Sequence, residues 1–508
     1  MGARTILAAL KVTFALTLAQ FQAMLLFVLV MYWIASRWEA IQKKFSPENL
    51  GPTMLAVIIA FSIFVGTMFA MDWGTEYLLL AVMLATSIAL ALCDTAISIC
   101  VFTALLFLRP WEIIQNNDYF AILPKATMSL CIMNAMLDLS RQKKFKVTWN
   151  PTASYILGFG IWLLVTSVKA ANPAEAQSFF FDTFFKNTFL FVLVLNLIRT
   201  QDELELIVWT IVLTMFGVGA ASVYQTWEYQ NSPVLAALNG YAASDSDELR
   251  LIGFGAFENS NDIAALMVMV LPFCLVPALQ KTASWLTRSV AVIVMIMIAT
   301  CIFMAKSRGA QMGVVAMLGM YAFLKMKNRK HALIIGVIGA LAMAGAMSLT
   351  KRNEADLDES KRFRMIYLET GLVMGVKNPL LGVGFNGYAD NFTRYQTGEV
   401  DGTLHRTAHN SWVLAFGETG FIGIILFIMI FASSVKTAWG IRHRNPAYLM
   451  ALIGYGIAMT FLSHTYFIYP YLLYALTGLA SHLQAKQEDP APENESLSVA
   501  RAIPAPAP

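Results

Sequence analysis

The chain has 508 residues, of which 57% are hydrophobic and 13% are charged. A soluble protein of this length carries about 25% charged residues, so the deficit indicates apolar surface that faces lipid. The net charge of +4 is small for the length, and no basic stretch is interleaved with aromatic residues, so the composition indicates no nucleic-acid partner. The composition therefore predicts an all-α, polytopic integral membrane protein.

Apolar segments long enough to cross a membrane recur along the chain, each close to the ~20 residues that a transmembrane helix needs. They lie near residues 12–35, 53–71, 119–139, 153–168, 184–200, 204–222, 262–280, 286–305, 309–325, 331–349, 409–434, 447–463 and 466–481. The apolar region 76–108 is interrupted at Asp94, which predicts either two short helices or one long bent helix. We expect about 12–15 transmembrane helices, with the exact number in residues 1–108 left open.

The distribution of lysine and arginine predicts the orientation of these helices. Basic residues gather in four short connections, near residues 37–44, 141–146, 325–330 and 436–444. Short basic loops stay in the cytoplasm, so helix counting places 223–261, 305–309 and 350–408 on the opposite, periplasmic side.

This orientation divides the chain into four parts. They are transmembrane helices with short loops over 1–349, a large and partly helical periplasmic loop over 350–408, C-terminal transmembrane helices over 409–483, and a proline-rich, disordered cytoplasmic tail over 484–508.

Three of the segments expected on the periplasmic side carry arginines at the edge of the membrane. Arg250 precedes the helix expected from residue 262, Arg308 lies in a short hairpin at 305–310, and Arg362 and Arg364 precede an apolar helical stretch. Arginine is always charged, and its planar fork of donors suits phosphate or carboxylate. The alternative is that each arginine extends to lipid headgroups, and the sequence leaves both interpretations open.

The run Ala408-His409-Asn410-Ser411-Trp412 closes the polar loop. His405 and His409 are spaced as two zinc ligands on a helix would be, but Arg406 stands where a metalloprotease has its glutamate and no third ligand has an obvious place. We expect no metal, and interpret His409 as a general base, with a structural or capping histidine as the alternative.

Two further features flank this histidine. Glu418 follows nine residues later, where its carboxylate either orients the site or pairs with an arginine. Residues 382–387 match the pattern G-x-G-x-x-G, but no strand precedes them, so they predict a tight turn after Pro379 and no dinucleotide site.

Several of these motifs, in this order, resemble the O-antigen ligase and polymerase superfamily of bacterial inner membranes. They are Arg250 before Gly-Phe-Gly-Ala-Phe-Glu-Asn-Ser-Asn, then Ser307-Arg308-Gly309, then Arg362 and Arg364 before Asn378-Pro379-Leu380-Leu381-Gly382-Val383-Gly384, and finally Ala408-His409-Asn410 before Glu418-Thr419-Gly420. The resemblance covers about residues 200–435.

The resemblance implies transfer of a glycan from a polyprenyl-diphosphate carrier (undecaprenyl diphosphate) to an acceptor hydroxyl on the periplasmic face of the inner membrane. It implies no cofactor and no metal. The acceptor remains open among lipid A core, protein and polysaccharide. By this resemblance His409 is the catalytic base, Arg250, Arg308, Arg362 and Arg364 bind the diphosphate or donor, and Glu418, Asn410, Glu258 and Asn259 support the site. Which of Arg362 and Arg364 matters stays open, because two arginines stand where the family usually has one. His405 lies in a more hydrophilic context and is expected to be dispensable.

Two other functions are compatible with parts of this pattern. A polymerase of lipid-linked repeat units would use the same donor chemistry, and the motifs do not separate it from a ligase. A transporter or flippase of lipid-linked glycans would place charged or helix-breaking residues at mid-membrane in paired halves, and we find no such internal repeat.

Overall fold

The computed structural model describes residues 3–39, 41, 75–109, 123–141, 147–232, 250–253, 259–326, 354–398 and 407–488. The expected spans at 53–71 and 331–349, the supporting residue Glu258 and the second histidine His405 lie outside these residues. The described residues form helices and turns, with no strand among them. The prediction of an all-α membrane protein is confirmed.

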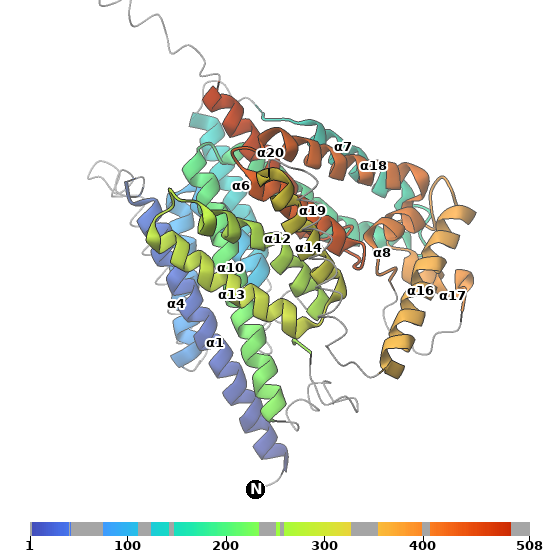
Figure 1. Cartoon of the computed structure of the whole chain (residues 1–508), viewed down its shortest axis with the longest axis horizontal. Coiled ribbons are helices and arrows are strands. Elements are labelled where there is room, and N and C mark those ends of the chain that lie inside the picture. Colours follow the sequence, from blue (N-terminus) through green and yellow to red (C-terminus); the bar gives the residue numbers. More distant parts are fainter. Residues whose placement is uncertain are drawn as a thin grey trace, which may run out of the picture.

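The helices are followed in chain order in Figure 1. They are α1 (Ala3–Ser36), α4 (Thr75–Cys93), α5 (Thr95–Leu108), α6 (Leu123–Arg141), α7 (Pro151–Ser167), α8 (Pro173–Phe179), the π-helix η3 (Phe180–Phe185), α9 (Lys186–Leu197), α10 (Gln201–Asn231), α12 (Ser260–Leu279), α13 (Trp285–Ala305), α14 (Arg308–Lys325), α16 (Glu354–Lys377), α17 (Tyr388–Tyr395), α18 (Ser411–Ile441), α19 (Pro446–Met459) and α20 (Ile468–Glu488).

Local sequence sets several of the helix starts. Thr200 and Glu203 form a capping box at the start of α10, and Asn150 caps α7 ahead of Pro151 at the first helical position. The interruption at Asp94 is such a start as well. Asp94 has extended backbone and accepts from the backbone N–H groups of Ala96 and Ile97, so the region 76–108 forms two helices and not one bent helix.

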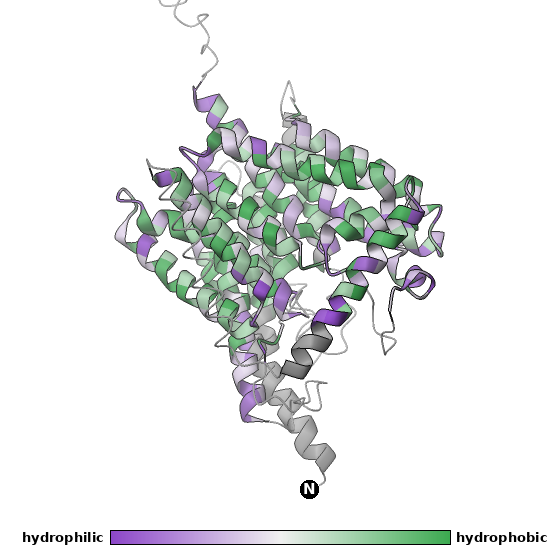
Figure 2. Cartoon of the chain, turned by 45° about the vertical axis from the view of Figure 1, so that its right-hand side comes forward, coloured by the Kyte–Doolittle hydropathy of each residue, from purple (hydrophilic) through white to green (hydrophobic). Residues whose placement is uncertain are grey.

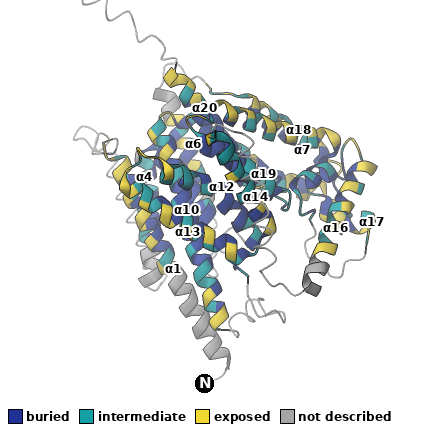
Figure 3. Ribbon diagram, viewed as in Figure 1, coloured by how far each residue is buried: buried dark blue, intermediate teal, exposed yellow. Residues whose placement is uncertain are grey.

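Apolar side chains are exposed along the outer helices. On α18, Phe421, Ile422, Ile425, Ile428 and Met429 form one exposed stripe at helical spacing. Figures 2 and 3 show the same property over the molecule, because outward-facing turns of α13 and α18 are both hydrophobic and exposed. A surface of this kind is suited to lipid and not to water.

Five helical segments are long and apolar enough to cross a membrane, within the part of the chain that the structure describes. They are Pro173–Leu197, Gln201–Asn231, Ser260–Leu279, Trp285–Ala305 and Ser411–Ile441. Shorter apolar helices lie at Gln20–Ser36, Ala81–Leu92, Thr95–Leu108, Pro151–Ser167 and Pro446–Met459. The chain is therefore a multi-pass membrane protein, while the total of 12–15 spans stays a prediction.

Helix α12 lies inside the bundle, and its residues from Ile263 to Val270 are all buried. Helix α14 crosses α19 at two glycines, and a Cβ on Gly313 would lie 2.6 Å from the carbonyl oxygen of Gly454. Small residues allow this close approach of two backbones in a membrane protein. The crossing fixes the start of α14, where Arg308 lies, relative to α19 and the turn that follows it.

The polar segment 350–408 contains α16 and α17, as its predicted helical content requires. Helix α16 packs against α18, and in Figure 1 both α16 and α17 lie at the edge of the molecule farthest from α1 and α4. The position of this segment on the periplasmic side stays a prediction.

Candidate functional site

His409 occupies a constrained turn where the polar segment enters α18. Its φ of 47° is left-handed, which is uncommon for a residue other than glycine. The next residue, Asn410, returns to extended backbone and caps α18 by accepting from the N–H groups of Trp412 and Val413, each at 3.0 Å. Strained backbone of this kind clusters at functional sites, and here it fixes the direction in which the His409 side chain leaves the backbone.

The environment of His409 combines burial with charge. The half-buried imidazole lies against the ring of Tyr367 on α16, with the two ring centroids 5.5 Å apart. Burial lowers the pKa of His409, the positive charge of Arg364 lowers the pKa further, and the negative charge of Asp262 opposes both. Near neutral pH the imidazole is therefore held in its uncharged form, which can accept a proton.

The two neighbouring arginines of α16 lie in different environments. Arg364 is partly buried and acts on His409, whereas the side chain of Arg362 is exposed. Position 364 shares the side of α16 that carries Tyr367, one turn further along the helix. Of the two arginines that the sequence does not separate, the structure brings Arg364 to His409.

Arg250 joins the end of α13 to the start of α12. Its Nε and Nη2 atoms donate to the carbonyl oxygen of Ala305 at 3.1 and 2.7 Å, and Nη2 also donates to Oδ1 of Asn261 at 3.1 Å. A cation at the C-terminal end of α13 is favoured by the helix dipole. Asn259, a predicted supporting residue, caps α12 by accepting from the N–H of Asn261.

Arg308 begins α14 directly after the turn that ends α13. Lys306 makes this turn with a left-handed backbone, and Arg308 is exposed. The following Gly309 lies against Phe461, whose side chain a Cβ at 309 would meet at 2.9 Å. The start of α14 therefore packs on the connection between α19 and α20. A common cavity for Arg250, Arg308 and Arg364 stays a prediction.

Residues 379–387 form the tight turn that the sequence predicts. Gly382 and Gly384 have φ of 63° and 100°. The N–H of Gly382 donates to the carbonyl of Asn378 at 2.9 Å, whereas the next two N–H groups donate to α18. Val383 donates to the carbonyl of Gly417 at 2.9 Å, and Gly384 donates to that of Glu418 at 3.0 Å. Helix α18 is kinked at Gly420, which has φ of 69°. Glycine is required where two backbones approach this closely.

The side chain of Glu418 stabilises this turn through hydrogen bonds. Its buried carboxylate accepts from the hydroxyl of Tyr466 at 2.8 Å and from the backbone N–H of Tyr388 at 3.1 Å, and the N–H of Asn386 donates to it as well. It therefore fixes the turn that joins α16 to α17. Between the two roles that the sequence leaves open, this arrangement favours orienting the site over pairing with an arginine.

Two residues that sequence reasoning missed form a hydrogen bond beside the site. Nε2 of His464, which is 1% exposed, lies 3.0 Å from Oδ1 of Asp262, and Nδ1 lies 2.7 Å from the hydroxyl of Tyr455. The only signal in the sequence is a short polar interruption, Ser463-His464-Thr465, between two apolar spans. An acidic residue in the first turn of α12 gives no sign of its partner, because the two residues are 202 positions apart.

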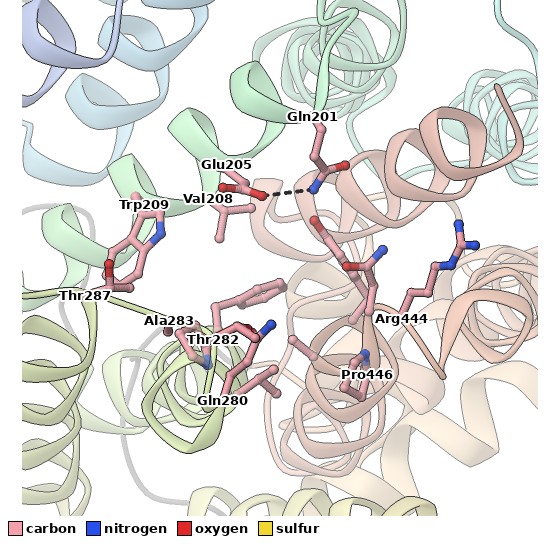
Figure 4. Close-up of a pocket in the computed structure, with 16 residues that line it drawn as sticks. Gln201, Glu205, Val208, Trp209, Gln280, Thr282, Ala283, Thr287, Arg444 and Pro446 are labelled. Atoms are coloured by element: carbon pink, nitrogen blue, oxygen red, sulfur yellow. Dashed lines mark hydrogen bonds between the residues drawn. The ribbon is translucent and has the colours of Figure 1, made fainter. Parts of the chain in front are cut away.

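A cavity of about 430 Å³ lies far from His409. Figure 4 shows that Gln201, Glu205, Gln280 and Arg444 are among its lining residues, which come from the start of α10, the end of α12 and the region before α19. Asp262 and the end of α12 are separated by roughly 25 Å along the helix axis. The cavity therefore belongs to the other end of the bundle. No group of three or more histidine, cysteine and acidic residues suited to a metal occurs among the residues described.

Comparison with known families agrees with the arrangement of the motifs. Residues 292–428 match the family described as O-antigen ligase, a segment that includes Arg308, Arg362, Arg364 and His409 but not Arg250. No curated protein matches the chain. The matched segment holds the turn at 379–387 and the start of α18, so this part of the chain is similar to the O-antigen ligase family.

Proposed function

We propose that this membrane protein transfers a glycan from a polyprenyl-diphosphate carrier to an acceptor hydroxyl, at the membrane face where His409 lies. The match of residues 292–428 to the O-antigen ligase family supports a glycosyltransferase. The observation that carries the specific chemistry is a half-buried histidine that packs on Tyr367 and whose pKa is lowered by burial and by the charge of Arg364. An uncharged imidazole next to a guanidinium suits a reaction that removes a proton beside a bound anion.

In this proposal His409 accepts the proton of the acceptor hydroxyl. The oxygen then attacks the anomeric carbon of the glycan, and the bond from that carbon to the diphosphate oxygen breaks. The bonding electrons leave with the polyprenyl diphosphate. General-base assistance of this kind is typically worth ~10²–10⁴ in rate. The fixed backbone of His409, set by its left-handed φ and the capping residue Asn410, supports such a role.

The arginines would neutralise the diphosphate. Arg250 lies at the end of α13, Arg308 at the start of α14, and Arg364 on α16 acts on His409. Charges on a leaving group are stabilised best by donors that are already oriented, and the hydrogen bonds from Arg250 to Ala305 and Asn261 orient its guanidinium. Arg362, which is exposed, is assigned to donor or acceptor positioning at the rim.

We assign this chemistry to the periplasmic face of a bacterial inner membrane. The basic loops on the other side of the bundle support that orientation, and they include Arg442 and Arg444 between α18 and α19. The acceptor is a hydroxyl of lipid A core, protein or polysaccharide. A polymerase that extends a lipid-linked glycan is the second candidate, because it would use the same donor chemistry.

The test is transfer by purified protein in detergent or vesicles. A polyprenyl-diphosphate-linked glycan and a hydroxyl acceptor are supplied, and both the glycosylated acceptor and the released polyprenyl diphosphate are measured. Equal amounts of the two products are expected. Release of diphosphate without acceptor glycosylation, or no reaction with any glycan donor, would contradict the proposal. Deletion in the source cell separates the two candidates, since a ligase defect accumulates long lipid-linked polymer and a polymerase defect accumulates single repeat units.

A further inference from the structure

A chain of hydrogen bonds connects Asp262 to the segment that carries His409. The imidazole of His464 contacts the carboxylate of Asp262 through Nε2 at 3.0 Å. The backbone N–H of His464 donates to the hydroxyl of Ser411 at 2.9 Å, two residues after His409. Ser411 donates in turn to the carbonyl of Leu462 at 2.7 Å. The start of α12 and the start of α18 are thus linked through one buried histidine.

The partners of the His464 imidazole determine which of its two ring nitrogens carries a hydrogen. A carboxylate only accepts, so Nε2 of His464 carries a hydrogen and donates to Oδ1 of Asp262. In the neutral imidazole Nδ1 is then an acceptor, and the hydroxyl of Tyr455 donates to it at 2.7 Å. Both ring nitrogens are satisfied by partners from other helices, so His464 is held in one tautomer and one orientation.

The hydrogen bond from His464 orients the carboxylate of Asp262 but leaves it partly exposed. Its side chain is 22% exposed, whereas that of its partner His464 is 1% exposed. The adjacent Asn261 accepts from Arg250, so the first turn of α12 contacts a predicted diphosphate ligand on one side and His464 on the other. Among the described residues, Asp262 from α12 raises the pKa of His409 by its charge and Arg364 from α16 lowers it.

We propose that Asp262 is a positioning carboxylate for the base His409, held in place by His464 and Tyr455, and that it stabilises the imidazolium formed when His409 takes the acceptor proton. The inference rests on the proposed function of His409. As the proton moves from the acceptor oxygen to the imidazole, positive charge develops beside the fixed charge of Arg364. A nearby carboxylate compensates that charge, which is the electrostatic role of an acidic partner to a catalytic histidine.

The experiment measures kcat and KM for the glycan donor across pH in wild type, Asp262→Asn, His464→Gln and Tyr455→Phe. Removing the negative charge in Asp262→Asn is expected to lower kcat roughly 3–10-fold, a fraction of what a general base contributes. The acid-side midpoint of the pH profile should move down by on the order of 0.5 pH unit, with donor KM unchanged. Asp262→Glu should restore part of the rate. His464→Gln should show a smaller change in the same direction, and Tyr455→Phe should leave the midpoint in place.

Asp390→Asn is the matched control, because Asp390 is an exposed acidic residue of α17 on the same polar segment, and it should leave both quantities unchanged. A purely structural role would lower the yield of folded protein without moving the midpoint. An Asp262→Asn protein that folds and keeps the wild-type kcat and midpoint overturns the inference. If Asp262→Asn does not fold, His464→Gln decides by the same readout, and failure of both to fold identifies a purely structural network. Absence of transfer by wild type would instead contradict the proposed function itself.

Discussion

The hydroxyl of Tyr466 donates a hydrogen bond to the buried carboxylate of Glu418 over 2.8 Å. Through this bond the connection between α19 and α20 supports the turn at 379–387, which in turn sets α16 against α18. The ring of Tyr466 also packs on Phe385 of that turn, with centroids 4.9 Å apart. One tyrosine therefore joins three parts of the chain that the proposed site requires.

Tyr466→Phe should destabilise the protein while preserving its aromatic packing. Loss of the hydroxyl leaves a buried carboxylate one donor short, which costs ~1–3 kcal/mol of unfolding free energy. The measurement is the unfolding midpoint of the protein in detergent. Tyr155→Phe is the control, because Tyr155 is a partly buried residue of α7 with no side-chain hydrogen bond found for it in the described part of the chain. Equal midpoints for wild type and Tyr466→Phe would contradict the assigned role of Glu418.

Gly382→Ala adds only one methyl group but should strongly destabilise the protein. The residue has φ of 63°, and a Cβ there would collide with the backbone of Glu418. The left-handed conformation alone costs roughly 1–2 kcal/mol for alanine. We expect a lower unfolding midpoint and reduced transfer, since the turn positions α16. Gly319→Ala is the matched control, because nothing lies within 4 Å of a Cβ at that position on α14, and it should be neutral or stabilising. Similar behaviour of the two variants would argue against a constrained turn.

Much of the fold was predictable from the spacing of apolar residues, because lipid-exposed backbone must be helical. The observed α7, α10, α12, α13 and α18 overlap the expected spans closely. The break at Asp94 was visible as a polar interruption, but its outcome depended on whether the carboxylate accepts from the next turn, which only geometry reveals.

The site was predictable only in part. Arg308 and His409 stood out because they adjoin long apolar segments, within which ionisable residues are rare and mark candidate functional sites. The choice between Arg362 and Arg364 depends on which face of α16 meets α18, and an i, i+2 pair on a helix necessarily faces two ways. Asp262 and His464 could not be predicted as partners, because they lie far apart in the sequence and neither is part of a recognisable local pattern.

Sidedness can be tested by substituted-cysteine labelling. Asp390→Cys on exposed α17 should react with a membrane-impermeant thiol reagent added outside the inner membrane, because the segment 350–408 is predicted to be periplasmic. His443→Cys, in the basic connection between α18 and α19, should react only after the membrane is permeabilised. Four of the five native cysteines, at positions 100, 131, 274 and 301, are buried and should give little background. The reverse labelling pattern would show the opposite topology and would place the proposed site on the cytoplasmic side.

The pH dependence of transfer should report the charge of Arg364. In the proposed mechanism neutral His409 is the base, so transfer should be lost as pH falls through its pKa, which burial and Arg364 hold below the ordinary value of 6.5. Arg364→Gln removes one of these causes and should move the acid-side midpoint upward, while also raising the KM for the glycan donor. Arg362→Gln, two residues away and exposed, should move the midpoint little. Identical pH profiles for the two variants would show that the charge of Arg364 does not affect the pKa of His409.

The most direct test of the account is the transfer rate of His409→Ala with a polyprenyl-diphosphate-linked glycan. We expect a loss of ~10²–10⁴ in rate with normal folding and membrane insertion. His443→Ala, an exposed histidine at the other end of α18, and His405→Ala should each cost little, and a chelator should leave all of these rates unchanged. Near-normal transfer by a folded His409→Ala protein would contradict the assignment of His409 as the base, and strong inhibition by the chelator would favour a metal held by the two histidines.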